Sequence, residues 1–389
     1  MNITVVSDVL GDETNGTTIA AMNLIRHLKS KGHKVKILCA DADKKGTPDY
    51  YIVPNLNLGV FNSIVRKNNV TLAKPKDDIV EEALKDADHI HIILPFTLGR
   101  HAMRYAREHS ISTTAGFHAQ AENLSSHVRM QGVKPVNYLI YRNFYKGFYK
   151  YIDGIHYPTQ FIRDTFEHSV KKHTNGYVIS NGVNSHIERK SVEKPQELKD
   201  KIVILTTGRY AVEKDQATLF RAVNYSKYKD KIQLVLAGQG PLTKKYERMA
   251  KKVPIKPIMK CFSREEMANV LNYCDIYAHP AIIELEGIAC LEAICAGKLV
   301  IVSDSKKSAT KNFAVDEKCI FKKRNPKDLA KVIDYFIEHP EEKKICEEKY
   351  LASAHLFNQV ECMERMEQMI NEVHEAKKQS LLQANNSNK

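Results

Sequence analysis

Residues 276–303 read IYAHPAIIELEGIACLEAICAGKLVIVS, and three local patterns follow one another within this stretch. Residues 276–279 have the composition of a buried strand, residues 287–296 form an apolar segment that begins at a glycine, and residues 299–303 are again strand-like. A strand, a helix and a second strand in this order predict two parallel strands joined by a crossover helix.

The same alternation extends through the rest of the chain. Further strands are predicted at 202–206 and 232–237 in the second half and at 2–7, 34–40, 89–94, 112–117, 154–157 and 177–180 in the first half, with helices at 17–31, 215–223 and 326–338. We therefore predict an α/β protein with two Rossmann-like domains that face each other across a cleft. Ligands of such sheets bind at the carboxyl ends of the strands.

The domain boundaries follow from composition. The polar stretch 184–199 (NSHIERKSVEKPQELK) has few apolar residues and reads as a linker. We expect an N-terminal Rossmann-like domain at 1–184 and a C-terminal Rossmann-like domain at 185–357. A last helix at 358–378 is expected to return to the N-terminal domain, and residues 379–389 are expected to be a disordered tail.

Composition limits the class of protein. The chain has 389 residues, of which 43% are apolar and 27% charged, so each domain can bury a core. It contains no long apolar run of the kind that crosses a membrane, and its first residues, MNITVVSDVLGD, do not resemble a signal peptide. The eight cysteines form no CxxC pair, which is typical of reduced cysteines in a cytosolic protein. We expect a cytoplasmic protein, at the inner face of the cell membrane if it binds one.

The formal net charge of +13 favours anionic partners, although solubility alone also explains such an excess. Residues 138–151 (YLIYRNFYKGFYKY) combine seven aromatic and three basic residues. This pattern suits peripheral contact with an anionic membrane, and it equally suits a core helix whose lysines extend to water. No zinc-finger or RRM signature is present, so we expect no nucleic-acid partner.

Three segments of the second half carry residues suited to a diphosphate. Gly208 and Arg209 follow a predicted strand, and Lys214 precedes the next helix. An arginine and a lysine can clamp a diphosphate, although solvated cations on an ordinary turn are the alternative. Gly238 and Gly240 form a tight turn after another strand, which is also a weak signal alone.

The third segment is the most specific. Glu284 and Glu292 lie eight residues apart around Gly287, which begins a helix whose free N–H groups can stabilise a phosphate. Glu292 interrupts an otherwise apolar helix, and a buried carboxylate requires a partner.

Together these segments resemble the retaining nucleotide-sugar glycosyltransferases of family 4, which have the GT-B fold. The first half agrees through Gly16 in the loop after the first strand, the segment HIHIILPFTLG at 89–99, His118 after a strand, and the turn Asn181-Gly182-Val183. The chain departs from the family in three places: Glu286 replaces a frequent aromatic residue, the N-terminal loop has a single glycine, and the last helix has no tryptophan.

The resemblance implies that the domain at 1–184 is the acceptor side and that the domain at 185–357 binds the nucleotide sugar. It also implies roles for individual residues. Arg209 and Lys214 would bind the diphosphate, Glu284 or Glu286 the sugar hydroxyls, and Glu292 the ribose. His118 would bond the sugar near the reacting carbon. The remaining donor-binding positions would be Gly16, Gly208, Gly238, Gly240, Gly287 and Ile288.

The implied reaction is transfer of a hexose, with retention, from a nucleotide-diphosphate sugar to a cell-envelope glycan or glycolipid. A UDP-sugar is the expected donor. No cofactor and no metal are expected, because the cations and the helix N-terminus stabilise the leaving group. The D-x-D patterns at 41–43 and 86–88 lack further ligands, and His89 and His91 are interpreted as core or cleft histidines.

Two alternatives remain. A GT-B epimerase would alter the sugar of its donor without any acceptor. A non-enzymatic basic protein that binds a membrane or nucleic acid would explain the charge, but it leaves the paired glutamates without a purpose.

Overall fold

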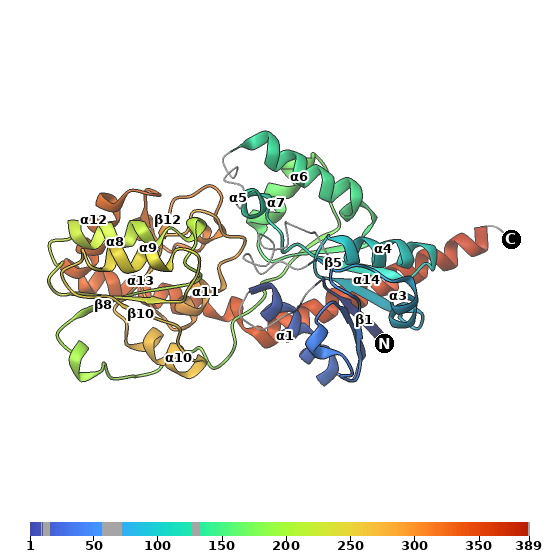
Figure 1. Cartoon of the computed structure of the whole chain (residues 1–389), viewed down its shortest axis with the longest axis horizontal. Helices are drawn as coiled ribbons and strands as arrows, with labels where there is room; N and C mark the ends of the chain where they lie inside the picture. The colour runs from blue at the N-terminus through green and yellow to red at the C-terminus, as the bar shows by residue number, and fades with distance from the viewer. Residues whose placement is uncertain (9, 11–15, 57–71, 127–132, 388–389) are drawn as a thin grey trace. The chain divides into compact units, whose positions relative to one another are not determined.

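A computed structural model describes residues 1–8, 10, 16–56, 72–126 and 133–387. The chain divides into two compact units, which are treated separately here (Figure 1). Unit 1 comprises Met1–Asn181 and Val360–Lys389, and unit 2 comprises Gly182–Gln359. The divisions therefore fall after residues 181 and 359, where the sequence placed them after 184 and 357.

Unit 1 is built on a seven-stranded parallel sheet with the strand order β3-β2-β1-β4-β5-β6-β7. The strands are β1 (Asn2–Val6), β2 (Lys34–Cys39), β3 (Tyr50–Ile52), β4 (His89–Ile92), β5 (Ser112–Gly116), β6 (Gly154–Tyr157) and β7 (Gly176–Val178). Its described helices are α1 (Gly16–Ser30), α3 (Asp77–Leu84), α4 (Thr97–Glu108), α5 (Ala121–Ser126), α6 (Lys134–Gly147), α7 (Gln160–Val170) and α14 (Gln359–Ser387).

Unit 2 contains a six-stranded parallel sheet with the order β10-β9-β8-β11-β12-β13. The strands are β8 (Ile202–Thr207), β9 (Ile232–Ala237), β10 (Ile258–Lys260), β11 (Ile276–His279), β12 (Val300–Ser303) and β13 (Ile320–Phe321). The helices are α8 (Gln216–Tyr225), α9 (Thr243–Ala250), α10 (Arg264–Tyr273), α11 (Ile288–Cys295), α12 (Pro326–Glu338) and α13 (Pro340–Ser353). The two sheets confirm the prediction of two parallel, Rossmann-like layers.

The last helix belongs to unit 1, as the red segment of Figure 1 shows. It packs Met366, Ile370 and neighbouring apolar residues into the core formed by β1, β2 and α1. Glu367 accepts hydrogen bonds from His27 at 2.8 Å and from His33 at 2.9 Å. These contacts fix α14 along most of its buried length.

Two expectations from the sequence differ from the structure. The helix α14 continues through Ser387, so the disordered tail is wrong for residues 379–387, because no glycine or proline stops the helix there. Residues 388–389 lie outside the described residues. The supposed linker is held on unit 2, where Asn272 accepts from the backbone N–H of Lys190 at 2.7 Å and Lys194 pairs with Asp275 at 2.6 Å.

Three buried histidines lie on one face of the unit 1 sheet. His89 and His91 on β4 both contact the hydroxyl of Thr114 on β5, at 2.7 and 2.8 Å. His156 on β6 donates from Nε2 to the carbonyl of Ile179 at 2.7 Å. Burial lowers the pKa of His89 to about 3 and that of His156 to about 4, and it places the pKa of His91 well below its ordinary value. All three are therefore neutral side chains of the core.

Acidification should destabilise unit 1 through these histidines. The pKa values of these histidines in the folded protein lie below the unfolded value of about 6.5. Their contribution to the free energy of unfolding is therefore fully present above about pH 6.5. It is lost as the pH falls, by about 4 kcal/mol in total at pH 5.5. Hydrogen exchange, corrected for its intrinsic pH dependence, should show loss of protection in β4 and β6. The β8 and β9 amides of unit 2 are the internal control, and equal protection of β4 at both pH values would contradict the expectation.

Candidate active site

The candidate site residues of unit 2 lie where its strand order reverses. β8 is hydrogen-bonded to β9 on one side and to β11 on the other, so the chain leaves these strands in opposite directions along the sheet. The loops after β8, β9 and β11 carry Arg209, Gly238 and Glu284, respectively. In open parallel sheets, this reversal point is where ligands bind.

The loop after β8 begins at Gly208, which has a φ of +134° that favours glycine. The methylene carbons of Lys214 lie 3.9 Å from the position that a Cβ at Gly208 would occupy. Arg209 donates to the carboxylate of Glu213 at 2.8 Å, and the carbonyl of Glu213 accepts from the N–H of Ile282 at 2.8 Å. The loop after β8 is thereby joined to the loop after β11.

The glycines of the β9 turn have a structural role that the sequence did not indicate. A Cβ at Gly238 would lie 2.2 Å from the carbonyl oxygen of Gly208, and one at Gly240 would lie 2.7 Å from the backbone of Tyr210. The two loops are therefore in backbone contact. Gly238 and Gly240 permit that contact, and their predicted role in a nucleotide pocket is separate from it.

A hydrogen-bonded network connects the cation with one of the two candidate acids. Lys214 Nζ forms a short ion pair with Glu284 Oε1, and His279 Nε2 lies 3.1 Å from the same oxygen. His279 Nδ1 lies 3.4 Å from the hydroxyl of Tyr277, which lies 2.8 Å from Thr207 Oγ1. Of Glu284 and Glu286, Glu284 is the acid joined to Lys214; Glu286 is 3% exposed.

Electrostatics keeps Glu284 ionised. Burial alone would raise its pKa, but the charge of Lys214 and the hydrogen bonds from His279 and Lys214 outweigh burial and lower the pKa to about 2. The site thus presents a carboxylate and an ammonium group that neutralise each other. A diphosphate that took over Lys214 would free Glu284 to accept hydrogen bonds from hydroxyl groups.

The N-terminus of α11 lies beside this network. Gly287 caps the helix with a φ of +89°, and a Cβ there would lie 2.6 Å from Thr310 and 3.7 Å from His279 Nε2. The N–H groups of Ile288 and Ala289 have no hydrogen-bond acceptor among the described residues. They remain available to an anion, as the helix dipole favours.

Glu292 lies one turn into α11 and is half-buried. Within the described part of the chain, its carboxylate forms no hydrogen bond or ion pair. Burial raises its pKa to about 7. An unsatisfied carboxylate of this kind can accept hydrogen bonds from two neighbouring hydroxyl groups of a ligand.

For the UDP-sugar donor and the ribose contact of Glu292 that the sequence resemblance implies, affinity should rise with pH. With a pKa near 7, roughly one-tenth of these side chains are ionised at pH 6 and nine-tenths at pH 8, so affinity should increase by at most roughly tenfold. UDP-glucose is the suitable ligand for calorimetry, because its diphosphate diester does not titrate in this range. Glu292→Gln should bind more weakly and with little pH dependence; an unchanged pH dependence in that variant would exclude Glu292.

The predicted residues of unit 1 have simpler surroundings. His118 follows β5, is half-buried and forms no hydrogen bond within the described residues; its ring centre lies 5.6 Å from that of His156. Burial lowers its pKa well below the ordinary value. Gly16, expected in a loop, is the exposed first residue of α1, and residues 11–15 before it lie outside the described residues.

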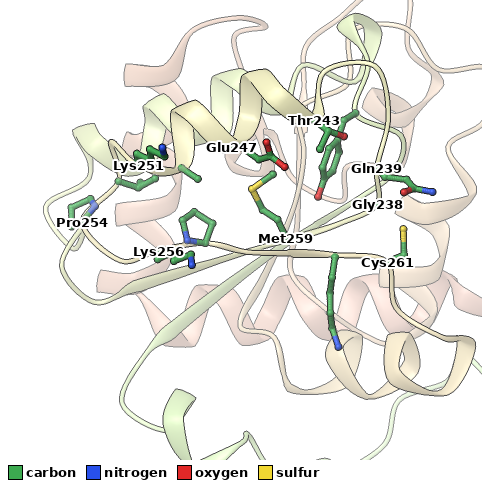
Figure 2. A pocket seen from close by; sticks show the side chains of 14 residues that line it. Gly238, Gln239, Thr243, Glu247, Lys251, Pro254, Lys256, Met259 and Cys261 are labelled. Carbon is green, nitrogen blue, oxygen red and sulfur yellow. The ribbon is translucent and has the colours of Figure 1, made fainter. Parts of the chain in front are cut away.

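A cavity of about 810 Å³ in unit 2 adjoins the β9 turn (Figure 2). Tyr210, Gly238, Gln239 and Cys261 line one end, and Glu247, Lys251 and Pro254 line the part between α9 and β10. Arg209, Lys214 and Glu284 are not among its lining residues. The cavity therefore adjoins the loops after β8 and β9 but does not include the charged residues Arg209, Lys214 and Glu284.

The sequence did not predict the residues that hydrogen-bond to Glu284 and Arg209, directly or through one another. His279, Tyr277, Thr207 and Glu213 were not singled out as site residues, although His279 ends a strand directly before the paired acids. Among the described residues, no cluster of three His, Cys, Asp or Glu side chains has the arrangement of a metal site. Likewise, no described helix is long and apolar enough to cross a bilayer.

Comparison with known families agrees with this architecture. Residues 14–186 match the family model described as Glycosyltransferase Family 4, and residues 187–350 match the model described as Glycosyl transferases group 1. The two family models make the chain a glycosyltransferase, and its two parallel-sheet units have the GT-B fold. The chain belongs to the family 4 glycosyltransferases.

Individual relatives are distant. The chain is 25% identical over 319 residues to the alpha-monoglucosyldiacylglycerol synthase of Streptococcus pneumoniae (strain ATCC BAA-255 / R6), covering 77% of this chain and 70% of the relative. Sucrose-phosphate synthase from Thermosynechococcus elongatus has a TM-score of 0.74 at 16% identity, over 97% of this chain and 100% of that structure. Anabaena HepE in complex with UDP and glucose has a TM-score of 0.72 at 14% identity, over 96% and 100%. Both structures support the fold.

Proposed function

We propose that this glycosyltransferase moves a hexose, with retention, from a UDP-sugar to a diacylglycerol-type lipid. The observation that carries the proposal is the hydrogen-bonded cluster of Lys214, Glu284 and His279, which lies beside the unbonded N–H groups at the N-terminus of α11. One relative is named as a synthase of an alpha-glucosylated diacylglycerol, which supports the lipid acceptor and the retained anomer. A neighbour in fold binds UDP and glucose, which supports the donor.

The proposed chemistry assigns each group one task. Bond breaking between the anomeric carbon and the diphosphate puts negative charge on the phosphate oxygen. Lys214, Arg209 and the N–H groups of Ile288 and Ala289 stabilise that charge, so that no metal or cofactor is needed. The acceptor hydroxyl attacks from the same face, a new carbon–oxygen bond forms, and its proton passes to the leaving phosphate.

The remaining contacts position the donor. Glu284, released by Lys214, accepts hydrogen bonds from the transferred sugar, and Glu292 accepts from the ribose. The Gly238 end of the cavity in Figure 2 holds the base. His118 is the proposed hydrogen-bond partner of the transferred sugar near the reacting carbon. Because nucleotide sugars are cytoplasmic metabolites, the reaction takes place on the cytoplasmic side of the membrane.

Thermal-shift measurements with a panel of nucleotide sugars test the donor. A ligand at 100 times its Kd stabilises the folded protein by about 2.7 kcal/mol, which is a shift of several degrees. UDP-glucose should shift the Tm more than GDP- or ADP-sugars do, and a panel without any shift would contradict the proposal. Incubation with donor alone distinguishes the epimerase, because only an epimerase would convert the sugar without a lipid.

A further inference from the structure

Two helices of unit 1 carry positive charge toward the solvent. On α4, arginines occur at spacings of four and three residues, and α6 and the turn after it add exposed basic residues. We call this set the α4–α6 surface; its members are Arg100, Arg104, Arg107, Lys134, Arg142, Lys146 and Lys150. The sequence contains no Asp or Glu between Glu122 and Asp153.

α4 and α6 are neighbouring helices of unit 1 (Figure 1), and a side-chain hydrogen bond joins them. Arg100 donates from Nη2 to the side chain of Asn143 on α6 at 2.6 Å, and the rings of Phe96 and Phe144 lie 6.4 Å apart. In the turn after α6, the ring of Tyr151 lies 4.1 Å from Arg107 of α4 and 4.4 Å from Lys150 of the same turn. Cations from both elements thus converge on one tyrosine.

Few of these charges are neutralised. Lys134, Arg142 and Lys146 form no ion pair within the described residues, whereas the ion pair of His101 with Asp77 at 3.0 Å marks the border of the surface toward α3. Burial and the nearby charge of Arg104 lower the pKa of Arg100, as expected where cations are crowded. A crowded, unneutralised cationic surface attracts a polyanion.

The same face of α6 exposes apolar side chains. α6 buries Tyr141 and Phe144, but Tyr138 is 38% exposed and Leu139 62% exposed. Leu139 is the most exposed of the large apolar residues in the described part of the chain. Arg142 and Lys146 follow Tyr138 at successive turns, so these apolar and basic side chains lie along one exposed face.

We propose that the α4–α6 surface binds an anionic lipid bilayer. Tyr138 and Leu139 enter the interface, and the basic residues around them contact the phosphates. The inference rests on the proposed function, because a lipid acceptor must be met at a bilayer. An exposed leucine beside the cations favours a bilayer over nucleic acid, whose phosphates provide no apolar layer for it.

Vesicle co-sedimentation of the full chain tests this surface without donor or acceptor. Wild-type protein should bind vesicles of phosphatidylglycerol and phosphatidylcholine, and bind phosphatidylcholine vesicles weakly. Arg142→Ala with Lys146→Ala should reduce binding by roughly 10- to 30-fold. Leu139→Ser should reduce it by roughly tenfold. Lys244→Ala with Lys245→Ala on α9 is the matched control, because it removes the same charge from exposed positions of unit 2.

The outcomes separate the alternatives. Near-wild-type binding by the control supports the surface, whereas an equal loss in the control would show that net charge alone is responsible and would overturn the proposal. Loss of DNA binding with unchanged vesicle binding in the α6 variant would also overturn it. In detergent micelles, both double variants should still transfer the sugar to diacylglycerol. If the wild-type protein failed to do so in micelles, the proposed function would be contradicted, whereas the result of the vesicle experiment would remain valid.

Discussion

Replacing Lys214 with alanine should reduce kcat/KM for sugar transfer by roughly 10³-fold, with little loss of folded protein. Lys214 is the cation that lies against Gly208 and forms an ion pair with Glu284. In the proposed mechanism, its removal takes away a charge that stabilises the leaving diphosphate. It also leaves the buried Glu284 carboxylate with His279 as its remaining hydrogen-bond partner in the network, so the pKa of Glu284 should rise.

Steady-state kinetics and thermal unfolding of the same preparation distinguish these effects. Lys245→Ala, at an exposed position of α9, is the matched control and should keep the wild-type rate. Arginine at position 214 retains the charge but changes its geometry, so it should restore part of the rate. Full activity in Lys214→Ala would exclude the lysine from catalysis.

Glu284→Gln should lower kcat/KM by roughly 10²-fold, whereas Glu286→Gln should have a much smaller effect. The difference follows from the network, since Glu284 contacts Lys214 and His279 and is held ionised with a pKa of about 2. The neutral amide of glutamine keeps the shape but removes the charge that orients Lys214. Both variants change one carboxylate that is less than one-tenth exposed, so each is the control for the other.

The pair should also be coupled. If Lys214 and Glu284 act as a unit, the double variant should lose less activity than the product of the two single losses. Independent, fully multiplicative losses would show that the ion pair has no role in catalysis. A larger loss for Glu286→Gln than for Glu284→Gln would instead assign the sugar contact to Glu286.

Much of the fold could be predicted because periodicity is a local property. The strand at 276–279 and the helix at 326–338 have the predicted bounds, since apolar runs and a proline at the helix start mark them in the sequence. The supposed linker at 184–199 was misread because its contacts with Asn272 and Asp275 join residues far apart in the chain. Polarity alone does not distinguish a linker from a polar segment held on a surface.

The site shows the same limit. The glutamates could be found from their spacing, but only the fold shows that Glu284 is bonded to Lys214, because the two lie 70 residues apart in sequence. His279 was missed because only the folded sheet brings it to Glu284. The aromatic stretch at 138–151 left two interpretations open; the structure shows that Tyr141 is buried in the core and that Leu139 is exposed, and contact with a membrane stays a proposal.

The most direct measurement compares the affinities of a nucleoside diphosphate and its monophosphate. Calorimetry at pH 8, where both ligands are fully ionised, should give a Kd for UDP that is roughly 100-fold lower than that for UMP, because in the proposed site Arg209, Lys214 and the α11 N-terminus contact the second phosphate. In Lys214→Ala, this ratio should fall to roughly 10 or less. Equal affinities for UDP and UMP in the wild type, or an unchanged ratio in the variant, would contradict a diphosphate clamp at these loops.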